Sequence, residues 1–185
     1  MILIVMFLAF TAAATSSSTP APQPSPAPCS SIDGFHTLDF WLGAWRVTSE
    51  GRYAGDDVVA TILDGCAIVE KWADVDGSHG MSLFYFNAFD KSWSQVWVTD
   101  RATARCGLKE KSLVARFPSG AVRFQGILPG APGSTIILDR TTLTPVNDGS
   151  VHQLIEISRD GGSTWSSTFD AIYAHSHDDS QNSAP

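Results

Sequence analysis

The fold is decided by a short aromatic stretch that reads Leu38-Asp39-Phe40-Trp41-Leu42-Gly43-Ala44-Trp45-Arg46-Val47. Three bulky apolar residues, Phe40, Trp41 and Leu42, are adjacent in it, which fits neither the alternation of a strand nor one face of a long helix. They predict a single tight turn that plugs a larger structure. Gly43 then frees the backbone for a close approach or an unusual φ angle, and we expect the first strand to begin at Trp45.

The chain after this stretch consists of short apolar runs separated by turn residues, at the spacing typical of an all-β barrel or sandwich. We expect strands at residues 45–50, 58–63, 67–73, 81–86, 93–99, 113–117, 121–126, 135–144, 151–158 and 164–174, and one weak or bulged strand within 100–111. The Asp-Gly pairs at 148–149 and 160–161 indicate hairpins. A meander of this length usually closes to remove its edges. The predicted fold is therefore all-β, an antiparallel up-and-down barrel of about ten strands.

The Gly-x-Trp formed by Gly43 and Trp45 resembles the opening of lipocalin-like (calycin) barrels. More closely, the stretch is similar to an uncharacterised bacterial domain family that opens Phe-x-Phe-Trp-x-Gly-x-Trp, and the similarity extends over residues 35–173. The resemblance implies that a 3₁₀ turn closes one end of the barrel and that Trp45 packs across that end. It also implies that a late arginine, for which Arg140 is the candidate, stacks on Trp45. Because that family has no assigned activity, the resemblance supports an expectation about the fold more than one about the function.

The chain divides into four predicted segments: a signal peptide at 1–14, a Pro/Ser/Ala-rich linker at 15–31, the barrel domain at 32–175 and a disordered tail at 176–185. The apolar run at 2–14 is too short to span a bilayer and ends in three alanines, although no Lys or Arg precedes it. Prolines at alternate positions from 20 to 28 predict an extended spacer. We expect a secreted or periplasmic protein without an integral membrane segment in its mature chain.

Charge and cysteine content restrict the partners. The formal net charge is −7 and no charged side chain precedes Asp33, so nucleic acid is excluded as an expected partner. In an exported protein Cys66 and Cys106 suit a disulfide, while two separate buried thiols are the alternative and Cys29 belongs to the linker. No Cys or His spacing suggests a metal site, and we expect no cofactor.

Strand alternation selects the candidate ligand-binding residues. In 67–73, Glu70 and Trp72 share one face while Lys71 takes the other, and Lys71 is expected to point to water. The same argument places Gln95 and Trp97 on one face of 93–99, and Gln153 with two isoleucines on one face of 151–158. The set Glu70, Trp72, Gln95, Trp97 and Gln153 describes an apolar pocket with a few polar groups. The alternative makes Glu70 and Gln95 a cross-strand pair or places them outside.

We expect this pocket to bind a small apolar or amphipathic ligand. The first alternative is a small-molecule barrel enzyme, similar to an isomerase or cyclase, in which Glu70 and His152 form an interior acid/base pair. The second is an interaction module whose interior is filled by its own side chains. The sequence contains no Gly-x-Ser-x-Gly, no His-Glu-x-x-His and no phosphate-binding glycine loop, so we favour binding over catalysis.

Two late motifs have structural rather than catalytic interpretations. Residues 158–165 match the Asp-box that recurs in sialidases, and we interpret the single copy as a hairpin in which Asp160 accepts from turn amides and Gly162 takes a positive φ. His175 lies where nitrobindin-like barrels carry the histidine that ligates haem. The later glycines of the nitrobindin opening are absent here, so we expect no haem.

Overall fold

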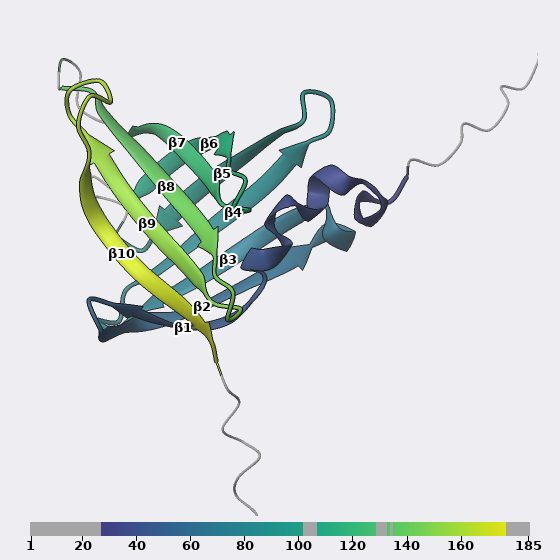
Figure 1. Ribbon diagram of the computed structural model, residues 1–185, viewed down its shortest axis with the longest axis horizontal. Coiled ribbons are helices and arrows are strands. Elements are labelled where there is room, and N and C mark those ends of the chain that lie inside the picture. The colour runs from purple at the N-terminus through teal and green to yellow at the C-terminus, as the bar shows by residue number, and fades with distance from the viewer. Residues whose placement is uncertain (1–26, 102–106, 129–132, 134, 177–185) are drawn as a thin grey trace, which may run out of the picture.

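The computed structural model describes residues 27–101, 107–128, 133 and 135–176 (Figure 1). Within these residues, ten antiparallel strands form one closed barrel in which each strand pairs with its neighbours in sequence and the last returns to the first. The strands are β1 (Gly43–Ser49), β2 (Arg52–Ile62), β3 (Ala67–Asp74), β4 (His79–Asn87), β5 (Ser92–Thr99), β6 (Leu108–Arg116), β7 (Val122–Leu128), β8 (Ile137–Pro145), β9 (Val151–Ser158) and β10 (Ser166–His175). The predicted all-β up-and-down barrel is confirmed.

The weak strand expected within 100–111 is wrong as a separate element. Leu108 begins β6, which continues through Arg116 and pairs with β5 from Val98↔Leu108 to Ser94↔Ser112. The charged residues Lys109 and Lys111 interrupt the apolar pattern, so the sequence pattern divides this one strand into two. The register shift in this region lies later, between Leu113 and Ala115.

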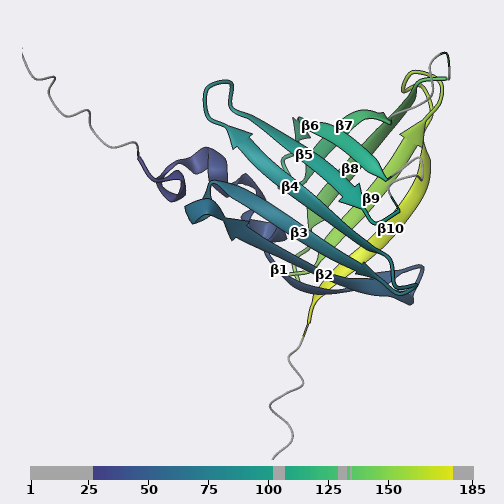
Figure 2. The ribbon, with the colours of Figure 1, turned by 180° about the vertical axis from the view of Figure 1, so that it is seen from behind.

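A 3₁₀ segment closes one end of the barrel, as the resemblance implied. The segment η2 (Asp33–Trp41) buries Phe35, Leu38 and Trp41 and packs against the barrel end (Figures 1 and 2). Trp45 is 1% exposed. Its ring stacks between Trp41, at 5.9 Å between centroids, and His175, at 4.1 Å, and its Nε1 donates to the Trp41 carbonyl over 3.1 Å. Trp45 therefore seals this end.

The predicted contact between Arg140 and Trp45 is wrong. The Arg140 guanidinium lies 3.8 Å from the centroid of the Trp165 ring and pairs with Glu156. Arg140 alternates along β8 with the buried residues Asp139 and Thr141, so its side chain is on the outer face. The other face of Trp45 is occupied by His175, its direct partner on β10.

A disulfide joins Cys29 to Cys66, and the predicted Cys66–Cys106 pairing is wrong. Cys29 lies in η1 (Cys29–Ser31), which contacts the short turn η3 (Leu63–Gly65) directly before Cys66. The sequence placed Cys29 in the linker because prolines precede it, whereas the structure attaches it to the barrel. Cys106 lies outside the described residues, as do the predicted signal peptide, residues 15–26 of the linker and residues 177–185 of the tail.

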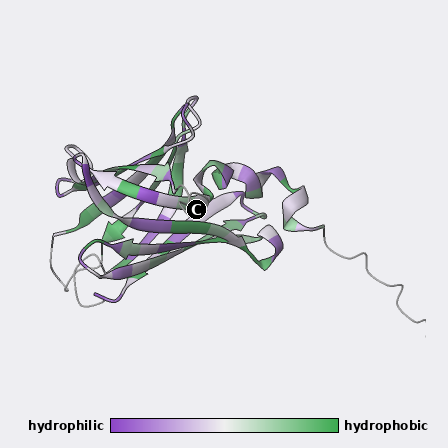
Figure 3. Ribbon diagram, turned by 90° about the horizontal axis from the view of Figure 1, so that it is seen from below, coloured by the Kyte–Doolittle hydropathy of each residue, from purple (hydrophilic) through white to green (hydrophobic). Residues whose placement is uncertain are grey.

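The closed half of the barrel is solid. Side chains from η2 and the adjoining strand segments fill it, among them Val59, Ile68, Phe84, Trp93, Phe124 and Leu143. Polar and apolar residues alternate along the strands (Figure 3), as expected when successive side chains take opposite faces of the wall. No helix in the described part of the chain has the length and apolar character needed to cross a membrane.

Candidate functional site

A cavity of about 340 Å³ occupies the half of the barrel opposite η2. Its mouth lies at the β3–β4 turn, the end of β5 and the start of β10, and its base lies midway along the strands. Residues of the β3, β4, β5, β6, β8, β9 and β10 regions line it: Glu70, Trp72, Asp74, Ser78, Gln95, Trp97, Thr99, Arg101, Gly107, Lys109, Lys111, Thr141, Gln153, Ile155, Thr168, Phe169 and Tyr173. Within the described residues, the half of the barrel away from η2 is therefore hollow, and the half beside η2 is filled by side chains.

All five residues predicted from alternation lie on this cavity: Glu70, Trp72, Gln95, Trp97 and Gln153. Glu70 is 4% exposed, whereas the neighbouring Lys71 is exposed on the outer face. The inward placement of the set is thus confirmed. On β3 the charged Lys71 marks the outer face, so the alternate residues Glu70 and Trp72 fall on the inner face.

Three neighbouring strands hold the polar base of the cavity. Gln95 on β5 donates from Nε2 to Ser82 Oγ on β4 over 3.0 Å, and the Ser82 hydroxyl also hydrogen-bonds Glu70 on β3. On the opposite wall, Tyr173 Oη donates to Gln153 Oε1 over 2.8 Å. Among the residues that the structure describes, Glu70 Oε2 and Gln95 Oε1 have no hydrogen-bond partner. The base therefore offers two buried acceptor atoms.

A second carboxyl group, Asp57 on β2, lies beneath the base and was not predicted as a site residue. It is 1% exposed, and neither of its carboxyl oxygens has a partner in the described part of the chain. Burial, with the nearby charge of Glu70, raises the pKa of Asp57 to about 9. Burial also raises the pKa of Glu70 to about 7, opposed by its bond from Ser82 and by two lysines. Near neutral pH, Asp57 therefore holds a proton.

The opposite side of the base is an ion-pair cluster of Lys109, Lys111 and Asp139. Lys111 Nζ donates to Asp139 and, over 2.6 Å, to Thr141, while Lys109 Nζ lies 3.1 Å from the other oxygen of Asp139. Burial lowers the pKa of Lys111 to about 8. The spacing of two between the lysines, and between Asp139 and Thr141, is a signal for a shared face. This spacing does not show that the shared face is the inner one, because lysine side chains usually point to water.

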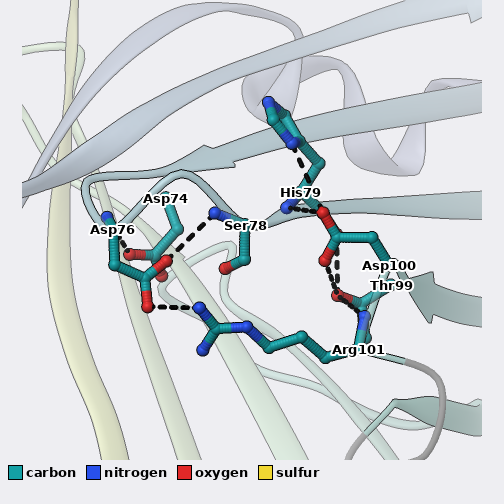
Figure 4. Close-up of polar contacts among 7 residues, drawn as sticks. All are labelled: Asp74, Asp76, Ser78, His79, Thr99, Asp100 and Arg101. Carbon is teal, nitrogen blue, oxygen red and sulfur yellow. Dashed lines mark hydrogen bonds and ion pairs between the residues drawn. The ribbon is translucent and has the colours of Figure 1, made fainter.

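Polar contacts join the β3–β4 turn to the end of β5 at the rim of the mouth (Figure 4). Arg101 Nη2 donates to Asp76 Oδ2 over 2.6 Å, and Asp76 in turn accepts from the Ser78 amide. The Asp100 carboxylate accepts from the His79 amide over 2.8 Å. These contacts fix a charged rim above the apolar upper wall of the cavity.

The predicted Glu70–His152 acid/base pair is wrong. His152 lies on the outer face of β9, where its Nε2 is 2.7 Å from Asp170 Oδ1 on β10. Glu70 faces the interior, so the barrel wall separates the two side chains. Alternation predicts that His152 and Gln153 lie on opposite faces of β9, and the structure confirms this.

The two late motifs have structural roles. Asp160 accepts from the Thr164 amide over 2.9 Å and from the hydroxyls of Ser158 and Thr164, and Gly162 has φ +94°, which confirms the turn interpretation of the Asp-box. His175 stacks on Trp45 at the closed end and does not line the cavity. Within the described residues no group of His, Cys, Asp and Glu has the arrangement of a metal site.

Comparison of the chain with protein-family models finds none that matches it, and comparison with curated proteins finds no similar sequence. The resemblance to lipocalin-like barrels thus stays a prediction, and functional inference depends on the cavity. A half-open barrel with an apolar upper wall and a polar base can enclose a small molecule and orient it.

Proposed function

We propose that this chain is an exported lipocalin-like barrel that binds a small amphipathic molecule in the hollow half of its interior. The observation that carries the proposal is the cavity of about 340 Å³. This volume lies within the range of about 300–1,000 Å³ that is usual for small-molecule sites.

The distribution of side chains supports an amphipathic ligand. Near the mouth the wall is formed by Trp72, Trp97, Ile155 and Phe169, and Trp72 meets Phe169 edge to face at 6.2 Å. At the base the wall is formed by carboxyl, amide and ammonium groups. A ligand with an apolar body toward the mouth and a polar end at the base matches both surfaces.

The solid half limits the size of the ligand. The core around Trp45, Phe84 and Phe124 fills the barrel below Asp57, so the interior is partly the self-filled module that we considered as an alternative. The hollow half alone is available to a ligand. This favours a compact molecule over a long acyl chain.

The Cys29–Cys66 disulfide supports export, because disulfides persist mainly in oxidising compartments. The apolar run at residues 2–14 agrees with that location. Mass spectrometry of the protein from its native host tests this part of the proposal. A mature chain that begins near Thr15 is the expected result, and a full-length cytoplasmic species contradicts it.

Titration with the neutral dye N-phenyl-1-naphthylamine tests the binding function. We expect saturable binding at one site with enhanced dye fluorescence. Trp97→Ala, on the cavity wall, should change the affinity at least about threefold, because it removes a large contact surface. The matched control Val98→Ala, on the outer face of the same strand, should leave it unchanged. Absence of saturable binding to the folded protein would exclude the proposed function.

A further inference from the structure

The base of the cavity has an excess of hydrogen-bond acceptors on its β3–β5 side. Glu70 Oε2 and Gln95 Oε1 are both buried and both lack a partner among the described residues. Burying an acceptor without a donor is unfavourable. A ligand that brings donors to this position removes that cost.

The two acceptors are fixed by their neighbours. Gln95 donates a hydrogen bond from its amide nitrogen to Ser82. Its amide oxygen therefore points away from Ser82. Ser82 stands directly opposite Glu70 across the β3–β4 pair and hydrogen-bonds it. Both residues that carry a free acceptor therefore lie beside Ser82, Glu70 on β3 and Gln95 on β5.

The charged groups around Glu70 decide which donor suits the base. Asp57 on β2 is uncharged at neutral pH because burial raises its pKa to about 9. Tyr173 on β10 is also uncharged, because a phenol ionises only at alkaline pH and burial raises its pKa further. Lys109 and Lys111 on β6 share Asp139 on β8. Glu70 is thus the one carboxylate facing this side of the base that has no cationic partner in contact with it among the described residues. Its charge favours a cation.

We propose that the ligand of the cavity is a primary amine, with its ammonium group donating to Glu70 and Gln95 and its apolar body lying along Trp97 and Trp72. This inference rests on the proposed binding function. An ammonium group has three donors and no acceptor, so it can donate to both free acceptors. Charge-assisted hydrogen bonds are stronger than neutral ones, and aromatic walls favour a neighbouring cation.

Calorimetric titration at pH 8 with three ligands of one apolar body tests the inference: 2-phenylethylamine, 2-phenylethanol and 3-phenylpropionate. We expect the amine to bind at least about tenfold more tightly than the alcohol and the carboxylate to bind most weakly. The affinity for the amine should fall from pH 8 to pH 6, because Glu70 takes up a proton over this range, whereas that for the alcohol should not.

Variants of Glu70 and Gln95 test whether the preference for the amine arises at these two residues. Glu70→Gln keeps the volume and removes the charge, so it should weaken the amine at least about tenfold and leave the alcohol within about twofold. Lys71→Gln, on the outer face of the same strand, should change neither. Gln95→Met removes the second acceptor and has a side chain of similar size. It should weaken binding of the amine while the protein keeps its unfolding transition. This variant takes the place of Glu70→Gln if Glu70→Gln does not fold.

The outcomes separate the two proposals. If the alcohol and the amine bind with equal affinity, or if the carboxylate binds best, the amine inference is overturned while the binding function stands. If none of the three ligands binds and N-phenyl-1-naphthylamine also fails to bind, both are overturned. Unchanged amine affinity in both Glu70→Gln and Gln95→Met would place the ligand elsewhere and overturn the inference.

Discussion

At the scale of single residues, Asp57 links stability to pH. Its pKa is raised above the ordinary value by burial and by the charge of Glu70. The folded state therefore binds more protons than the unfolded state between about pH 4 and pH 9, and the free energy of unfolding falls as pH rises through this window. Glu70, whose pKa is raised to about 7, contributes with the same sign.

Asp57→Asn should stabilise the protein at alkaline pH. The variant replaces a carboxyl group that must keep its proton to stay buried, so we expect a gain on the order of 2 kcal/mol at pH 8. The gain should disappear near pH 3, where the wild-type group is mostly protonated in the unfolded chain as well. Denaturant unfolding at both pH values measures this. The control is Asp56→Asn, an exposed neighbour on the same strand. A loss of stability in Asp57→Asn at pH 8 would contradict our account of Asp57.

Trp45→Ala should cost about 3–5 kcal/mol of unfolding free energy, because it removes a fully buried aromatic side chain. The variant also empties the space between Trp41 and His175. Urea unfolding measures the loss. Phe89→Ala, at a fully exposed aromatic residue, is the control and should change nothing. A cost below about 1 kcal/mol would show that Trp45 does not seal the barrel end.

At the scale of elements, the disulfide attaches η1 to the turn η3. Cys29 and Cys66 are 37 residues apart. Cross-linking a loop of this length restricts the unfolded chain and is worth about 2–4 kcal/mol. Because η2 begins shortly after η1, the disulfide anchors the start of the segment that closes the barrel.

Replacing both cysteines, Cys29→Ser with Cys66→Ser, should lower the free energy of unfolding by about 2–4 kcal/mol. Dithiothreitol should have the same effect on the wild type and none on the double variant. Peptide mapping of the non-reduced protein should recover a Cys29–Cys66 peptide. Recovery of a Cys66–Cys106 peptide instead would contradict the structure.

Local patterns predicted some elements well and others poorly. Alternation placed Glu70 inside because the adjacent Lys71 marks the outer face, and it grouped Gln95 and Gln153 with the apolar residues on their own faces. Lys111 is equally inward, yet no single-strand pattern reveals this, because its partner Asp139 lies 28 positions away in sequence. The disulfide partner of Cys66 escaped prediction for the same reason, since pairing across the fold depends on tertiary contacts.

At the scale of the whole molecule, closure of the sheet was predictable and its filling was not. Ten consecutive antiparallel strands leave an edge at each end unless β10 pairs with β1. Which half of the interior is solid depends on how η2 and the large side chains around Trp93 and Phe84 pack together. Sequence alternation identifies inward residues, but it does not show whether they meet each other or enclose a space.

The six tryptophans of the chain lie in three regions: the cavity, the solid half of the barrel and the Asp-box turn. Trp72 and Trp97 line the cavity. Trp41, Trp45 and Trp93 belong to the solid half. Trp165 lies under Arg140 at the Asp-box turn. Each indole N–H is therefore a separate reporter of its own region.

The most direct test of the hollow half is a ¹⁵N-indole NMR titration of the protein with 2-phenylethylamine and, separately, with 2-phenylethanol. We predict that the Trp72 and Trp97 indole signals shift with one common dissociation constant for each ligand, while those of Trp41, Trp45, Trp93 and Trp165 stay in place. Equal shifts of all six signals, or shifts confined to Trp165, would contradict a binding cavity in this barrel.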